Sequence, residues 1–372
     1  MIGQYIKNAK VNMNLETKDF KKFPTTRYQG SKRKILPWIY ENVKNLEFDS
    51  VLDACGGSAS VSYLFKKMNK RVTYNDKLKF NYLIGRALIE NQNIKFIQQD
   101  VDDLLSTKGT EYDFIQKTFK NIYYLNHENK WLDAISYGVF NMNHYKGDVL
   151  DYKKSIALYA LFQSCLIKRP FNLFHRKNLE IRTKDVIRNF GNKTTWERPF
   201  ENYFKHFINE ANDIIFDSNI PCKSINESIL NIKETNFDLI YLDPPYLNHE
   251  CKNETANYLK CYHFLEGIVN YPKWNDLIDF NSINLRLKNV DTENDFQRDS
   301  IYNTLDQILE TFKNSKIVFS YKKGGKPSIE WLVARIKRHK KKVYTRSLHY
   351  HYALNRQNGD AHKNREVLIF GI

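Results

Sequence analysis

The chain has 372 residues, of which 42% are hydrophobic and 14% aromatic; this composition excludes a disordered chain and supplies a substantial core. At roughly 100–200 residues per domain, the length indicates two domains or one catalytic core with a large insertion. Lys and Arg outnumber Asp and Glu by 58 to 42, which gives a formal charge of +16. A globular chain with this excess is expected to bind a polyanion, and nucleic acid is the first candidate.

Signals for membranes, export and metal binding are missing from the sequence. It has no run of about 20 apolar residues that could span a bilayer, and residues 1–8 lack the apolar core of a signal peptide. The five cysteines are odd in number and never spaced C-x-x-C, which argues against a disulfide scaffold and a structural zinc site. We therefore expect a cytosolic protein without a metal.

The positive charge is concentrated in blocks. Residues 313–372 carry fifteen basic and three acidic side chains, and residues 168–198 carry nine and three. Residues 238–312 carry six basic and thirteen acidic side chains. Any one of these runs could be an ordinary solvated face, but several basic blocks around an enzyme-like core favour a nucleic-acid groove.

Short apolar runs alternate with helical stretches in the first part of the chain, after a polar segment at 1–26 that we expect to be a loose arm. In chain order the pattern predicts a helix at 35–44, a strand at 51–54, a helix at 59–69, a strand at 71–74 and a helix at 79–91. Such alternation predicts a parallel α/β sheet.

The alternation stops at residues 105–199, where helical stretches near 111–125 and 151–167 stand among Asn, Tyr, Lys, His and Phe. It returns with a helix at 201–217 and strands at 220–225, 237–242, 316–320 and 366–370. An acidic, loop-rich section separates the strand at 237–242 from the strand at 316–320. The predicted organisation is one α/β domain formed by residues 1–104 and 200–372, with a mainly helical insertion at 105–199.

The tetrapeptide Asp243-Pro244-Pro245-Tyr246 follows the apolar strand 237–242 directly. Ligands of open α/β sheets bind beyond the carboxyl ends of the strands. Two prolines end the strand and fix φ, so the carbonyl of Pro244 has a set direction. A carboxylate, a rigid carbonyl and an aromatic face suit a flat base with an exocyclic amine: two acceptors take its two N–H groups, and the ring stacks on Tyr246. An ordinary strand-ending turn is the minor alternative.

A second motif, Asp53 to Ala59, contains Gly56 and Gly57 after the first strand. Small residues let a ligand approach the backbone, and the following helix N-terminus favours polar groups. Asp76 ends the second strand twenty positions after Gly56, a spacing that suits ribose hydroxyls. Alternatively, the glycines form only a turn and Asp76 is a helix N-cap.

A third segment, Arg27-Tyr28-Gln29-Gly30-Ser31-Lys32, precedes the first strand; alone, it could be a basic surface loop. In chain order, Tyr28 to Lys32, Asp53 to Ala59, Asn75-Asp76, the large insertion and Asp243 to Tyr246 resemble the D12 class of adenine-specific DNA methyltransferases, which methylate adenine N6 with S-adenosylmethionine. The resemblance covers nearly the whole chain. It implies a Rossmann-like methyltransferase sheet with residues 105–199 as the target-recognition insertion.

Three further segments resemble a subgroup found with type IIS restriction–modification systems: Lys168 to Arg176, Tyr262 to Gly267 and Ser320 to Ser328. The chain departs from the class pattern F-x-G-x-G in the glycine turn, where Cys55 replaces the aromatic residue and Ala59 the last glycine. Ser31 stands where a glycine is common. We expect Cys55 to be a packing residue, because this chemistry needs no covalent enzyme intermediate.

The resemblance implies roles for individual residues. Asp243, Pro244, Pro245 and Tyr246 would be catalytic. S-adenosylmethionine, released as S-adenosylhomocysteine, would be held by Tyr28, Gly30, Lys32, Asp53, Gly56, Gly57, Asp76 and Asp243, with Ser224 and Ile225 near its adenine ring. The partners would be double-stranded DNA and a cognate restriction endonuclease, and the enzyme would act as a monomer in the bacterial cytosol without a metal.

The predicted DNA contacts come from the basic blocks, which would hold phosphates and offset the cost of flipping the target base. The first group is Lys168, Arg169, Arg176 and Lys177; the second is Arg335, Lys337, Arg338 and Lys340.

Other readings stay open. Similar motifs serve methylation of RNA bases and of protein glutamine, although the large basic insertion favours DNA. The chain could also be a non-catalytic DNA-binding subunit, which the intact Asp243 and Tyr246 argue against. A hydride-transfer Rossmann enzyme would need G-x-G-x-x-G after the first strand, and that spacing is missing.

Overall fold

The structure is a computed structural model that describes residues 15–16, 19–20, 22–25, 27–107, 112–184, 193–248, 257–288, 295–297, 299–349 and 365–372. Most of the predicted arm at 1–26 lies outside the described residues, as do 108–111 and 185–192 of the predicted insertion.

A seven-stranded sheet organises the chain in the order β3-β2-β1-β4-β6-β9-β8. The first five of these strands run parallel, β9 pairs antiparallel with β6, and β8 pairs antiparallel with β9. Their bounds are β1 Ser50–Asp53, β2 Arg71–Asn75, β3 Lys223–Ile225, β4 Leu239–Leu242, β6 Lys316–Lys322, β8 Val343–His349 and β9 Arg365–Gly371. A separate two-stranded antiparallel sheet pairs β5 Leu247–Asn248 with β7 Gly325–Lys326. The predicted α/β fold with a mostly parallel sheet is confirmed.

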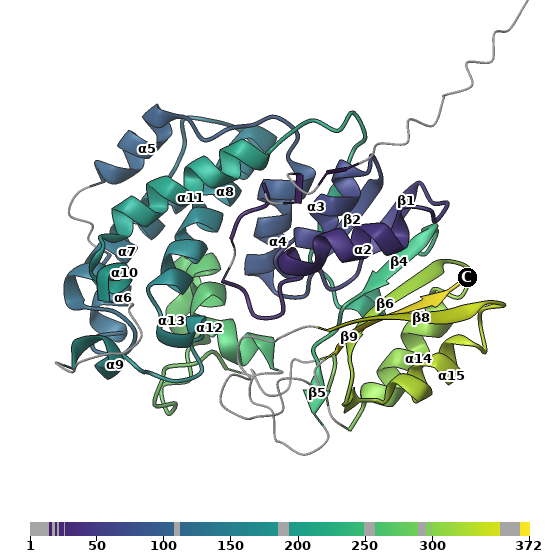
Figure 1. Cartoon of the computed structure of the whole chain (residues 1–372). Coiled ribbons are helices and arrows are strands. Elements are labelled where there is room, and N and C mark those ends of the chain that lie inside the picture. The colour runs from purple at the N-terminus through teal and green to yellow at the C-terminus, as the bar shows by residue number, and fades with distance from the viewer. Residues whose placement is uncertain are drawn as a thin grey trace, which may run out of the picture.

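Helices cover both faces of the sheet because successive strand residues point to opposite sides. In β4, Leu239 and Tyr241 face one core, and Ile240 and Leu242 face the other. The first core packs against α2 Leu36–Val43, α3 Ser60–Lys67 and α4 Lys79–Gly85, which continues as a π-helical turn to Glu90; the second packs against α14 Ile301–Thr311 and α15 Ile329–Ile336 (Figure 1).

A helical region lies beside the sheet (Figure 1). It comprises α5 Gln98–Leu105, α6 Phe114–Thr118, α7 Asn126–Phe140, α8 Gly147–Ile167, α9 Glu180–Thr183, α10 Lys193–Glu197, α11 Phe200–Ile214, α12 Tyr258–Val269 and α13 Trp274–Leu277. The long helix α8 is buried on nearly all sides from Ser155 to Leu166 and packs against α4, α11 and α12. The insertion boundaries 105–199 remain a prediction, and in space the helices α5, α11, α12 and α13 join this region.

Several elements differ from the predictions. The predicted helix at 111–125 is the short α6, and β8 was not predicted because its side chains are mostly exposed and basic or polar. Phe20 and Phe23, in the segment predicted to be loose, are buried in the first core. Among the residues that the structure describes, no helix has the length and apolarity needed to cross a bilayer.

Candidate active site

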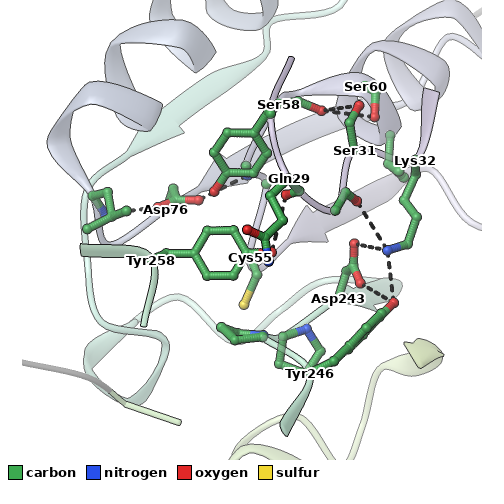
Figure 2. A pocket seen from close by; sticks show the side chains of 18 of the residues that line it. Gln29, Ser31, Lys32, Cys55, Ser58, Ser60, Asp76, Asp243, Tyr246 and Tyr258 are labelled. Carbon is green, nitrogen blue, oxygen red and sulfur yellow. Dashed lines mark hydrogen bonds and ion pairs between the residues drawn. The ribbon is translucent and has the colours of Figure 1, made fainter. Parts of the chain in front are cut away.

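A cavity of about 810 Å³ opens at the carboxyl ends of β1, β2 and β4, where the sequence places its motifs. Its lining includes the segments Arg27–Lys34, Asp53–Ser58, Asn75–Leu78 and Asp243–Tyr246, so the structure brings the three motifs together around one space (Figure 2). The volume suits a drug-sized ligand or cofactor.

Asp243 lies at the centre of a compact polar cluster (Figure 2). The ammonium group of Lys32, nearly fully buried, lies 2.7 Å from Asp243 Oδ2 and donates a hydrogen bond to the Tyr246 hydroxyl at 2.8 Å. That hydroxyl in turn donates to Asp243 Oδ1 at 2.8 Å. The N-terminal motif and the D-P-P-Y motif, 211 positions apart from Lys32 to Asp243, therefore form one site.

A second carboxylate completes this cluster. Glu366 of β9 is fully buried, with Oε1 2.7 Å from the Tyr246 hydroxyl and 3.5 Å from Lys32 Nζ. Burial raises the pKa of Asp243 above its ordinary value, the Lys32 charge opposes that shift, and the Glu366 charge adds to it.

The glycine turn is built around tight contacts with Tyr74 and Asp76. A Cβ at Gly56 would lie 2.1 Å from the Tyr74 ring, so only glycine fits there. The Gly57 N–H donates to Asp76 Oδ2 at 3.0 Å, and the Leu78 N–H donates to Asp76 Oδ1 at 2.9 Å. Asp76 thus fastens the glycine turn to Leu78, the N-cap residue of α4, while lining the cavity. Asp76 itself is not the N-cap of this helix, and its contact with ribose hydroxyls stays a prediction.

The charge of the cavity depends on pH through the buried carboxyl groups of Asp53 and Asp76. Burial raises the pKa of Asp53 to about 7 and that of Asp76 to about 6. Ser62 Oγ donates to Asp53 Oδ2 at 2.7 Å and partly offsets the shift at Asp53. Together with Asp243, these side chains give the cavity an acidic wall.

The segment around Tyr28 forms a further part of the cavity wall. The Tyr28 ring stacks on Tyr262 of α12 with a centroid distance of 5.0 Å, and its hydroxyl accepts a hydrogen bond from Asn81. Gly30 has φ +83°, and a Cβ there would lie 2.8 Å from the Tyr258 hydroxyl oxygen. Positive φ and close approach both require glycine at this point of the turn.

Cys55 also lines the cavity. Burial raises the pKa of its thiol well above the ordinary value, and the charges of Asp76 and Asp243 add to the shift. A thiol held in its protonated form is a poor nucleophile, which agrees with the predicted packing role.

Ser224 and Ile225 are not among the residues that line the cavity. Both lie on the edge strand β3, and the Ser224 hydroxyl donates to the Tyr82 carbonyl of α4, away from the site. Glu227 and Ile229, a few positions later, line the cavity instead. We therefore move the proposed contact with the cofactor's adenine ring to these two residues.

Lys168 and Arg169 are buried, so the prediction that they contact DNA is wrong in this structure. Lys168 Nζ lies 2.7 Å from Glu128 Oε1 and donates to the Arg198 carbonyl. The Arg169 guanidinium donates to three backbone carbonyls of the following loop, those of Leu173, Arg176 and Lys177. These side chains shape the loop, while those of Arg176 and Lys177 are exposed and partly exposed.

The second predicted DNA-binding group lies at the wrong end of the sheet. Arg335, Lys337, Arg338 and Lys340 are at the end of α15, where Ile336 and Lys340 adjoin Gly371. Gly371 pairs with Ile317 near the start of β6, so this cluster sits at the amino ends of the parallel strands. The cavity opens at the carboxyl ends, and we withdraw these four residues from the proposed interface.

The structure places at the site several residues to which the sequence analysis gave no individual role. Phe171, 63% exposed, lines the cavity from the loop that Arg169 holds, with a left-handed φ of +61°. Arg27 and Lys34 are exposed basic side chains of the lining. Glu366 could have been noticed as an acidic residue beginning an otherwise apolar strand, Glu366 to Phe370.

The fold and these motifs are those of an amino-methyltransferase, and a comparison with protein families gives the class. Residues 28–267, more than half of the chain, match the D12 class N6 adenine-specific DNA methyltransferase family, and the chain belongs to this family.

The chain is also similar to the Type II methyltransferase M2.HphI of Haemophilus parahaemolyticus. The two are 25% identical over 355 residues, which cover 94% of this chain and 98% of that protein. The predicted activity, site-specific methylation of adenine in DNA, is confirmed at the level of the family.

Proposed function

We propose that this adenine methyltransferase takes its methyl group from S-adenosylmethionine and transfers it directly to N6 of an adenine flipped out of duplex DNA. The observation that carries the proposal is the cluster of Asp243, Lys32 and Tyr246 at the carboxyl end of β4, open to the cavity.

The cavity residues fit the donor, which carries positive sulfonium and ammonium groups. Asp53, Asp76 and Asp243 supply negative charge. Gly30 and Gly56 also line the cavity, at positions where a side chain would collide with Tyr258 and Tyr74. Tyr28, Gly57 and Lys32 complete this set, with Glu227 and Ile229 beside the adenine ring. When bound, the donor supplies an electrophilic methyl group.

The residues of this chain then orient the base. The N6 amine of adenine is conjugated with its ring and is a poor nucleophile, so orientation is the main task; it can contribute about 7–11 kcal/mol. Asp243 and the Pro244 carbonyl accept its two N–H groups, which draws the nitrogen toward tetrahedral geometry with its lone pair toward the methyl group. Pro245 keeps the turn rigid, and the Tyr246 ring stacks on the base.

DNA lies over the mouth of the cavity. Arg27, Lys34, Arg176 and Lys177 hold phosphates there, and Phe171 contacts the bases beside the target. Removing the target base from the duplex costs a few kcal/mol, which these contacts offset. Protein and RNA substrates are the competing possibilities, and the family membership favours DNA.

The similarity to a Type II methyltransferase supports a role as the modification enzyme of a restriction–modification system, with a cognate endonuclease as partner. The enzyme acts as a monomer in this proposal, because its three motifs meet within one chain.

The test is incubation of the purified protein with labelled S-adenosylmethionine and mixed-sequence duplex DNA, followed by nucleoside analysis by mass. Label in N6-methyladenine that is absent with Asp243→Ala supports the proposal, and sequencing of modified sites gives the specificity. Label on RNA or protein instead would replace the substrate, and DNA binding without any transfer would indicate a non-catalytic subunit.

A further inference from the structure

Glu366 is placed where the fold gives no reason for a charge. It stands in β9, a strand whose other residues from Val367 to Gly371 are buried and almost all apolar, and its own side chain is fully buried. A buried carboxylate is costly unless it is paired and hydrogen bonded. Three of its partners lie at the active site or beside it: Ser320 Oγ donates to Oε1 at 2.6 Å, the Tyr246 hydroxyl lies at 2.7 Å, and Lys32 Nζ at 3.5 Å.

The Tyr246 hydroxyl lies between two carboxylates. Its oxygen is 2.8 Å from Asp243 Oδ1 and 2.7 Å from Glu366 Oε1, and it accepts a hydrogen bond from Lys32. A phenol carries one proton, so it donates to one carboxylate at a time. Both contacts can be hydrogen bonds at the same time only when one of the two carboxyl groups is itself protonated.

We propose that Glu366 is a positioning residue that acts through the Tyr246 hydroxyl, turning this hydroxyl into a switch that lets Asp243 take up the proton of the methylated amine. This inference rests on the proposed function. While Asp243 is ionised, the hydroxyl donates to Asp243. When Asp243 becomes protonated, its O–H donates to the hydroxyl oxygen, and the hydroxyl turns its own proton to Glu366.

In the chemical step, methyl transfer to N6 is followed by loss of one N6 proton. The N6 lone pair forms the new C–N bond while the bond between sulfur and the methyl carbon breaks, and its electron pair stays on sulfur. The nitrogen then carries a positive charge and two hydrogens. One N–H bond breaks, its electron pair returns to nitrogen, and the proton passes to the Asp243 carboxylate. The proton leaves to solvent when the product departs.

The charged and titratable groups around Glu366 come from four elements: Lys32 from the N-terminal segment, Asp243 and Tyr246 from the turn after β4 together with Tyr241 within β4, and Lys322 from β6. The negative charge of Glu366 raises the pKa of Asp243, which makes Asp243 a better proton acceptor. Removing that charge lowers the pKa of Asp243.

The decisive variants are Glu366→Gln, Tyr246→Phe and their combination. Glutamine keeps an acceptor oxygen for the hydroxyls of Ser320 and Tyr246 but removes the charge. Single-turnover methyl transfer to duplex DNA is measured from pH 5 to 9, together with donor affinity. We expect Glu366→Gln to lower the rate at pH 8 about tenfold and to change donor affinity less than about twofold. The acid limb of the pH–rate profile, where the rate falls as Asp243 becomes protonated, should move to lower pH.

Adding Glu366→Gln to Tyr246→Phe is expected to lower the rate less than about twofold further, because contacting residues that act together are not additive. Glu128→Gln is the matched control: Glu128 is another buried glutamate beside a lysine, in α7, and its loss leaves the acid limb unchanged.

Fully additive losses with an unmoved acid limb would show that Glu366 is only structural, and would overturn the proposal. Thermal melts of every variant identify those that fail to fold. If the Glu366 variants do not fold, the pH–rate profile of Tyr246→Phe is compared with that of the unmodified enzyme, and an unshifted acid limb contradicts the switch. No methylation of adenine by the unmodified enzyme would instead refute the proposed function.

Discussion

Two buried clusters of lysine and carboxylate lie in different parts of the molecule. In the helical region, Glu128 of α7 faces two cations, Lys168 and Arg182, each 2.7 Å from its Oε1. At the active site, Lys32 faces two carboxylates, Asp243 and Glu366. The two clusters differ in charge balance, and their side chains are buried except that of Asp243, which is 16% exposed.

This balance sets opposite pKa directions. Burial alone would raise the pKa of Glu128, but the hydrogen bond and charge of Arg182 and the charge of Lys168 lower it overall. At Asp243 burial also raises the pKa, and the single lysine does not reverse the shift. An excess of cations keeps a buried carboxylate ionised, which suits a structural role. An excess of carboxylates raises the pKa of one of them, so that this group is able to take up and release a proton.

The largest effect is expected at Asp243, the active-site carboxylate that is able to take up a proton. Asp243→Asn removes the charge and one acceptor for the amine, and we expect kcat to fall by about 10³-fold. DNA binding, measured by fluorescence anisotropy, should change less than about threefold, because the phosphate contacts lie elsewhere. A rate within tenfold of the unmodified enzyme would contradict the catalytic role.

Replacing the cation of the active-site cluster tests the charge balance directly. Lys32→Met removes the cation that contacts both Asp243 and Glu366, so the pKa of Asp243 rises further and the acid limb of the pH–rate profile moves to higher pH. We expect about a 100-fold loss of kcat at pH 7, with partial recovery at pH 9. A loss of equal size at all pH values would mean that Lys32 acts only through donor binding.

The corresponding change in the helical region should affect folding and spare catalysis. Glu128→Gln leaves two buried cations without a counter-charge, at an expected cost of about 3 kcal/mol in the free energy of unfolding. The pKa of Glu128 is below its ordinary value of 4.5, so its stabilisation is present above that pH and disappears as the pH falls through the lowered value. Urea unfolding at pH 7 and at pH 4 should therefore show a smaller difference between the two proteins at pH 4.

The acidic wall predicts a pH dependence of donor binding. Asp53 and Asp76 have pKa values raised to about 7 and about 6, so both lose charge as the pH falls from 7.5 to 5.5. A cationic donor should then bind about three- to tenfold more weakly, as measured by calorimetry. Asp76→Asn should flatten the lower part of this curve, and an unchanged curve would exclude Asp76 from donor binding.

The smallest effect concerns the loop of the helical region that reaches the cavity. Phe171→Gly removes an exposed ring and permits the left-handed φ of +61°, so the free energy of unfolding should stay within about 1 kcal/mol. We expect the KM for duplex DNA to rise about threefold, while Phe171→Tyr keeps the ring and the original KM. Equal KM values for all three proteins would show that Phe171 does not contact DNA.

The sequence was informative where chemistry and strand pattern coincide. The strands before Gly56, Asp76 and Asp243 carry continuous apolar runs, and parallel strands bring their carboxyl ends together, so the meeting of these motifs was predictable. The placement of basic residues was not: Lys168 and Arg169 stand in a basic block but are buried, because partners at Glu128 and in the loop after residue 172 satisfy them. Such partners depend on tertiary packing, which a charge count does not contain.

Strand β9 brings Glu366 beside Lys32, although the two residues are 334 positions apart in the chain. A ribosome therefore makes the N-terminal motif, the glycine turn and D-P-P-Y well before it makes the last member of the cluster. Contacts of such sequence separation form late. Under the proposed role of Glu366, a nascent chain that already holds every recognisable motif still lacks one member of the active-site cluster, which is added when β9 inserts between β6 and β8.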